Sequence, residues 1–95
     1  MRITVRANFH LKEALGARQI EIVLPVGTTL TGLLSRMVET WGDKLTPQVF
    51  EPNSKLIHSY IRLLVNGQGI EFLHGTETTL SEGDEVLLLF PVSGG

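Results

Sequence analysis

Cysteine is absent from this sequence of 95 residues. Without thiols the chain forms no disulfide, holds no zinc or iron–sulfur cluster through sulfur, and has no cysteine nucleophile. Its length allows one small soluble domain that is stabilised by a hydrophobic core alone. Any sulfur chemistry must therefore use a group other than a thiol.

Long hydrophobic runs and a large excess of one charge are also missing. No apolar stretch is long enough to span a membrane, and the N-terminus alternates charged and apolar residues instead of forming a signal-peptide core. A net charge of −2 offers no basic stripe for binding nucleic-acid phosphates. We expect a cytoplasmic protein, monomeric when free, that binds neither nucleic acid nor membrane.

The charges that are present are unevenly distributed. Residues 1–62 hold eight basic and five acidic side chains, a net charge of +3, whereas residues 63–95 hold five acids and no base. These acids either steer the protein toward a basic partner surface around its C-terminal end or are solvated turn residues. They are Glu71, Glu77, Glu82, Asp84 and Glu85.

Alternation of apolar and polar residues predicts two strands near the N-terminus. Residues 2–9 alternate strictly, and residues 20–24 alternate again before Pro25 and Gly27. A polar stretch around Gly16 separates them, so we expect an N-terminal hairpin.

A helical period follows. Apolar residues recur at i, i+3, i+4, i+7, i+8 and i+11 from Leu30 to Trp41, so this stripe, with Met37, is assigned to the core. Thr28 or Thr29 is suited to cap the helix, and Gly42 to end it in the left-handed conformation.

Residues 43–59 contain two prolines and show no clear period, so we expect an irregular connection with a short helical turn at 48–51. Four apolar residues of this connection are expected to attach it to the core. They are Val49, Phe50, Leu56 and Ile57.

The last third predicts a strand at 60–65, a tight turn at Asn66 and Gly67, a short strand-like segment at 70–73, a turn at 80–84 and a buried strand at 86–90. One main helix can cover one face of a mixed four- or five-stranded sheet in which the final strand lies beside the first. This α+β order is that of the β-grasp, or ubiquitin-like, fold, formed by residues 1–95 as a single domain.

Side chains offer little chemistry. His10, His58 and His74 are far apart and show no metal-ligand spacing, so we expect no metal site. Asp84 and Glu85 are neighbours whose side chains point to opposite faces of a strand; we expect them to close the turn after Gly83 rather than form an acid–base pair.

The C-terminal residues are better candidates. After the last strand come Pro91, Val92 and Ser93, then Gly94 and Gly95. Residues 91–95, expected to form a flexible tail, would reach roughly 17 Å when extended. Two residues without a Cβ pass through a narrow slot, and the α-carboxylate, ionised at neutral pH, can attack an activated phosphate inside another protein.

Four segments together resemble a known family: LVNG at 64–67, IEFL at 70–73, TLSEGDEV at 79–86 and FPVSGG at 90–95. Nearly the whole chain resembles the MoaD/ThiS family of ubiquitin-like sulfur carriers, which includes the molybdopterin synthase small subunit, and is similar to archaeal small modifier proteins. Family members of the molybdopterin branch usually have two prolines where this chain has Phe90 and Pro91. The thiamine branch is generally shorter between helix and third strand, which argues against a thiamine carrier.

The resemblance implies that an E1-like enzyme similar to MoeB or ThiF adenylates Gly95 with ATP, and that the adenylate becomes a thiocarboxylate. The chain would bind no cofactor itself and would not be a catalyst alone. As the molybdopterin synthase small subunit it would donate sulfur to a pterin precursor inside a MoaE-like large subunit. Other acceptors (thiamine, cysteine or transfer-RNA pathways) and isopeptide linkage to lysines, as in a ubiquitin-like modifier, remain alternatives.

The family's pattern also implies which residues meet the partners. If Val86, Leu88 and Phe90 face the helix, then Leu87 and Leu89 face outward beside Arg6 on the first strand. Exposed leucines on a sheet indicate a docking surface unless the tail or a loop covers them. We therefore expect Leu87, Leu89 and Arg6, together with Pro91, Val92 and Ser93, to bind the partner enzymes.

Overall fold

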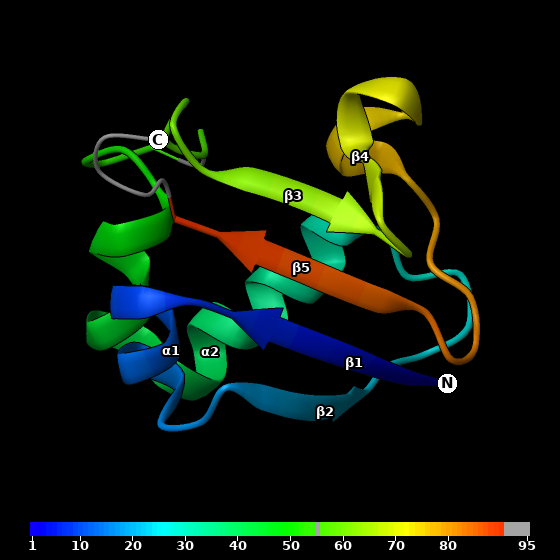
Figure 1. The fold of residues 1–95 in the computed structure, drawn as a ribbon, viewed down its shortest axis with the longest axis horizontal. Helices are drawn as coiled ribbons and strands as arrows, with labels where there is room; N and C mark the ends of the chain where they lie inside the picture. The colour runs from blue at the N-terminus through cyan, green and yellow to red at the C-terminus, as the bar shows by residue number, and fades with distance from the viewer. Residues whose placement is uncertain (55, 91–95) are drawn as a thin grey trace.

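A computed structural model describes residues 1–54 and 56–90. Figure 1 shows the chain as a sheet with helices against one side of it. Its elements are β1 (Arg2–Ala7), α1 (Phe9–Leu15), β2 (Gln19–Val23), α2 (Leu30–Val49), β3 (Arg62–Val65), β4 (Gln68–Gly69) and β5 (Glu85–Leu89), with two 3₁₀ turns, η1 (Ile70–Phe72) and η2 (Gly75–Glu77), before β5.

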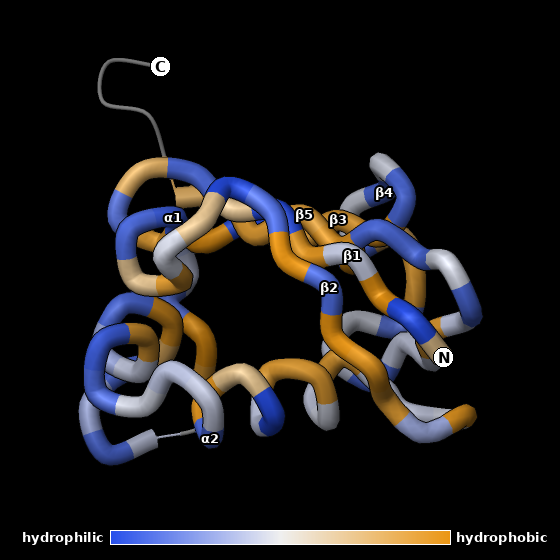
Figure 2. Tube along the Cα trace, turned by 90° about the horizontal axis from the view of Figure 1, so that it is seen from below, coloured by the Kyte–Doolittle hydropathy of each residue, from blue (hydrophilic) through white to orange (hydrophobic). Residues whose placement is uncertain are grey.

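The sheet has five strands in the order β2-β1-β5-β3-β4. The last strand, β5, lies between β1, to which it runs parallel, and β3, to which it runs antiparallel. Figure 2 shows the sheet as one layer and α2 as the other. This arrangement confirms the predicted mixed sheet with one main helix and with the final strand beside the first. Within the described ranges, no helix combines the length and the apolar character needed to cross a membrane.

The core lies between the inward face of the sheet and the apolar stripe of α2. Burying each large side chain of this core stabilises the fold by about 1.5–3 kcal/mol. The alternation of β1 and β5 and the helical period are confirmed by burial, with at most 6% exposure for each of Ile3, Val5, Ala7, Leu30, Leu33, Leu34, Met37, Val86 and Leu88.

The predicted N-terminal hairpin is wrong in its connection. β1 and β2 are antiparallel neighbours, but α1 joins them, and Phe9 begins this helix instead of extending the strand. Leu11, Ala14 and Leu15 are its buried residues, and Gly16 ends it with a φ of 78°. Phe9 continues the alternation of β1 by coincidence, and this concealed the short i, i+3, i+4 pattern that follows.

The main helix is longer than the sequence predicts. Thr29 caps it by accepting a hydrogen bond from the Gly32 amide, at 3.4 Å. Gly42 has the expected positive φ, 47°, but it kinks the helix rather than ending it, and a second segment continues to Val49. The irregular connection predicted from residue 43 is wrong over this part, because the burial of Leu45 and Val49 stabilises a helical segment that contains Pro47.

Three local predictions in the second half of the chain are also wrong. Leu56 is 67% exposed, although Val49 is buried and Phe50 and Ile57 pack against the core as expected. The helical turn expected at 48–51 is instead the end of α2. Residues 70–72 form the 3₁₀ turn η1 and not a strand, because β4 has already ended at Gly69.

The turns are as predicted. Asn66 and Gly67 adopt φ values of 51° and 83°, which suit the tight turn between β3 and β4. Gly83 takes a φ of 83° in the turn that leads into β5.

Candidate docking surface and tail exit

Leu87 and Leu89 lie on the face of β5 that points away from α2. Arg6 of β1 and Leu64 of β3 are the cross-strand neighbours of Leu87, and Arg62 of β3 is the neighbour of Leu89. We call these five residues the outer face. The structure thus brings Arg6, Leu87 and Leu89 together, with both leucines only partly buried.

Two ion pairs flank the leucines of the outer face. Arg6 lies 3.8 Å from Glu85, and Arg62 lies 3.3 Å from Glu71. All four side chains are 40% or more exposed, and exposed pairs contribute at most about 1 kcal/mol. Both arginines can therefore exchange these partners for a carboxylate on another protein.

The outer face continues into an open depression between the end of β5 and α1. Three of its lining side chains, Arg6, Lys12 and Arg18, are basic, and Glu13 is acidic. Leu87 and Leu89 form its apolar wall. A partner that covers this region would meet an apolar centre with a basic rim.

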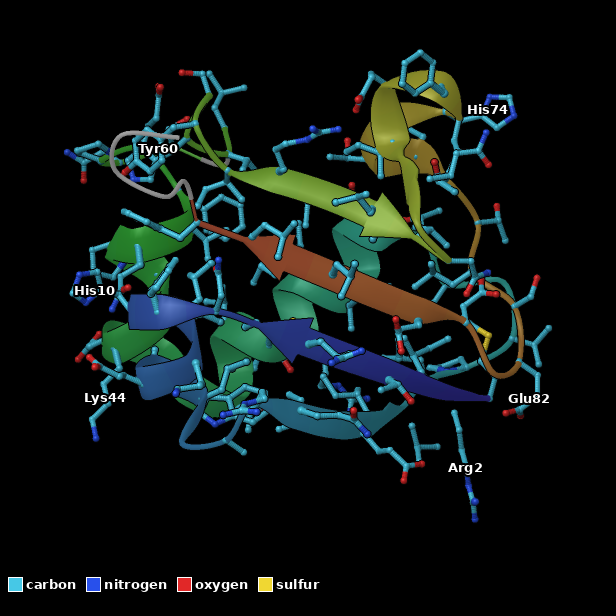
Figure 3. The ribbon with its side chains drawn as sticks, in the orientation of Figure 1. Arg2, His10, Lys44, Tyr60, His74 and Glu82 are labelled. Carbon is cyan, nitrogen blue, oxygen red and sulfur yellow. The ribbon has the colours of Figure 1, made fainter. Side chains whose placement is uncertain are left out.

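Two acidic residues of the last third lie far from this end of the sheet. Figure 3 shows Glu82 at the opposite end of the molecule from His10 and Tyr60. Glu82 accepts a hydrogen bond from the Arg2 amide at 3.1 Å, and Asp84 accepts one from the Ser81 amide at 2.8 Å. Of the two alternatives for the acids of the last third, turn residues is the one that fits Glu82 and Asp84, and Asp84 closes the turn before β5 as predicted. The five residues of β5 place them about 17 Å from its far end.

Phe90, the last residue described before the tail, is held by side chains that sequence reasoning missed. The Asn8 carboxamide accepts a hydrogen bond from the Phe90 amide at 2.7 Å and donates one to the Phe90 carbonyl at 3.1 Å. The Phe90 ring makes edge contacts with His10 and Tyr60, at centroid distances of 5.7 and 5.4 Å. Figure 3 shows His10 and Tyr60 on either side of the end of β5.

Local patterns could not have found this arrangement, because Asn8 and Phe90 are 82 residues apart. The available signal was Asn8 itself, a residue type that often precedes a helix. His58 stacks on Tyr60 at 4.8 Å, so two of the three histidines belong to the aromatic cluster at this end of the sheet.

The predicted reactive residues lie outside the described part of the chain. Pro91, Val92, Ser93, Gly94 and Gly95 all follow Phe90, and their roles stay predictions. Among the residues that the structure describes, no group of three or more histidine, aspartate or glutamate side chains could hold a metal ion.

The comparison with protein families decides the relationship. The model of the ThiS family matches residues 5–95. The chain belongs to the ThiS family. The match begins in β1 and includes the outer face, Asn8 and the whole segment after β5.

Three relatives place this ThiS-family chain among known proteins. Sulfur carrier protein CysO of Mycobacterium tuberculosis is 26% identical over 96 residues and is covered completely, as is this chain. The small archaeal modifier protein 1 of Methanosarcina acetivorans is 26% identical, with a TM-score of 0.80 and coverage of 99% of this chain and 96% of that one. A putative molybdopterin converting factor subunit 1 from Pyrococcus furiosus shares the fold, with a TM-score of 0.75, 21% identity and coverage of 97% and 99%.

Proposed function

We propose that this ThiS-family protein carries sulfur as a thiocarboxylate on Gly95. The observation that carries the proposal is the family match through residue 95, in a chain that has no thiol of its own. The docking role of the outer face belongs to the same proposal. Its partly buried leucines, with arginines beside them, provide an apolar contact for an activating enzyme. This contact lies at the end of the sheet where β5 ends.

The chemistry uses a partner enzyme and ATP. The Gly95 carboxylate attacks the α-phosphorus of ATP, which forms an acyl-adenylate and releases pyrophosphate. Hydrosulfide then attacks the acyl carbon, displaces AMP and leaves a thiocarboxylate. The carrier acts as a cosubstrate in this scheme, and the E1-like enzyme supplies the catalytic groups.

Two acceptors merit testing. One relative matched over its full length is the sulfur carrier CysO, which favours a CysO-like role with a cysteine precursor as acceptor. The role of molybdopterin synthase small subunit, with a MoaE-like partner, is supported by a likeness of fold to the Pyrococcus furiosus subunit. Incubating the thiocarboxylated protein with each acceptor system, and measuring which one consumes the thiocarboxylate, separates the two.

A second function, conjugation to lysines of other proteins, is favoured by the small archaeal modifier protein 1 from Methanosarcina acetivorans. It shares the activation step and differs in the nucleophile that displaces AMP. Protein-linked ladders that disappear when Gly95 is deleted would establish it.

ATP–pyrophosphate exchange with the cognate E1-like enzyme tests the activation step. The full chain should support exchange, and a chain that lacks Gly95 should not, although its outer face is intact. Exchange that survives the deletion would contradict the proposal.

A further inference from the structure

We propose that Asn8 is a positioning residue for the reactions of Gly95. It holds the main chain of Phe90, so that the tail begins from a fixed point at the edge of the docking surface. This inference rests on the proposed function and assigns to it a residue that the chemistry itself does not require.

The pairing of β5 with its neighbouring strands β1 and β3 ends before Phe90. The last pair with β1 joins Ala7 to Leu88, and the last pair with β3 joins Arg62 to Leu89. Beyond these pairs the two hydrogen bonds from the Asn8 carboxamide take the place of a strand neighbour for Phe90. The carboxamide therefore gives Phe90 the two main-chain hydrogen bonds of one further ladder position.

The Asn8 side chain makes these two hydrogen bonds instead of a capping hydrogen bond to α1. It occupies the N-cap position of α1, where an asparagine side chain normally accepts a hydrogen bond from the first free amides of the helix. Its side chain makes no capping bond. The polar group that the helix would use is directed to Phe90 instead, whereas Thr29, at the N-cap of α2, does cap its helix.

The backbone next to Asn8 is strained in a way that supports this geometry. Phe9 adopts a φ of 48°, which is rare for a bulky residue, and its side chain is 51% exposed. This conformation turns the chain from β1 into α1, so that β1 ends at Ala7. Strain of this kind persists where the surrounding structure requires it, and it is frequent at functional sites.

The Phe90 side chain is fixed as well, since its ring lies between His10 and Tyr60. Main chain and ring together define one orientation for the residue that precedes the tail. A tail that starts from a fixed orientation brings its carboxylate to the nucleotide more often than one whose base is frayed, because reaction requires near-attack geometry.

The test compares Asn8→Ala with a matched variant at the other end of β5. Asn66 accepts a hydrogen bond from the Glu85 amide at 2.9 Å and donates one to Asp84, also at 2.9 Å. Asn66→Gly removes these bonds and tolerates the positive φ of this position. The two variants thus lose similar bonds at opposite ends of one strand.

Four quantities are measured for the full-length proteins: the melting temperature, hydrogen exchange of the Phe90 amide, the Kd for the E1-like enzyme, and kcat for ATP–pyrophosphate exchange. We expect Asn8→Ala to speed Phe90 exchange and to lower kcat about tenfold with Kd changed less than twofold, because the five residues of the outer face are unchanged. Asn66→Gly should lower the melting temperature similarly and keep kcat. Asn8→Asp, which keeps the acceptor for the Phe90 amide, should give an intermediate kcat.

Each other outcome has a definite meaning. If Asn8→Ala has the same kcat as the protein without substitutions, Asn8 is not a positioning residue. The same conclusion follows if Asn66→Gly lowers kcat as much as Asn8→Ala does. If the unmodified sequence supports no exchange at all, the proposed function itself fails, and the inference fails with it.

Discussion

Neighbouring leucines of β5 have opposite surroundings. Leu88 is 1% exposed and lies in the core, whereas Leu87 and Leu89 lie on the outer face. Strict alternation along a strand made this division predictable from the sequence, because successive side chains point to opposite faces. The Asn8 contact with Phe90 was not predictable in this way, since no local period links residues from the two ends of a chain.

The leucines of the outer face should matter for binding and not for folding. We expect Leu87→Ser with Leu89→Ser to weaken affinity for the E1-like enzyme by roughly 10- to 100-fold, because a buried apolar anchor contributes about 1–3 kcal/mol to an interface. Calorimetric titration measures the affinity, and urea unfolding measures the stability. A matched variant, Leu88→Ala, should lose about 2–5 kcal/mol of stability by leaving a cavity. Unchanged affinity in the double variant would refute the docking surface.

The elements show where sequence patterns succeed and where packing overrides them. The stripe from Leu30 to Trp41 predicted the first part of α2, and Thr29 is one of the two caps that the sequence indicated. The segment after Gly42 was hidden by Pro47, which locally disfavours a helix, and only the burial of Leu45 and Val49 explains it. α1 was missed because seven residues give too short a period to compete with the alternation before it.

The kink in α2 should depend on glycine. Gly42 combines a φ of 47° with a ψ of −124°, a region that residues with a Cβ avoid. Gly42→Ala should therefore lower the free energy of unfolding by about 1–3 kcal/mol. Urea unfolding checks this, with Ser35→Ala, an exposed position of the same helix, as a control that should change stability by less than about 0.5 kcal/mol. Equal free energies of unfolding for the two variants would show that the kink does not require glycine at position 42.

At the scale of the whole molecule, bases outnumber acids in the depression at the far end of β5, where Glu13 is the acid in the lining. The basic residues Arg6, Lys12 and Arg18 line the depression at the end of β5. Glu82 and Asp84 lie at the other end of this strand, in the turn that precedes it. The sequence showed that acids are concentrated in the last third but not where they lie, because the fold places the turn before β5 at the opposite end of this strand from Phe90. The topology itself was predictable, since one helix with a broad apolar stripe can cover only one face of the sheet.

This separation predicts the sign of electrostatic steering. Lys12→Glu with Arg18→Glu should slow association with the E1-like enzyme by about tenfold at low salt, and the difference should shrink as ionic strength rises. Glu82→Lys, at the far end, is the control and should leave the association rate within about twofold. Stopped-flow measurement at two salt concentrations gives these rates. A faster association of the first variant would mean that the partner surface is basic.

The absence of cysteine makes the central claim directly measurable, because sulfur bound covalently to this protein cannot be a side-chain disulfide or persulfide. The decisive measurement is the intact mass, with fragmentation of the C-terminal peptide, of the protein recovered from its own cells. We predict a population in which sulfur replaces one oxygen of the Gly95 carboxylate. Recovery of the protein solely with an unmodified carboxylate, or solely in isopeptide linkage to other proteins, would contradict the account.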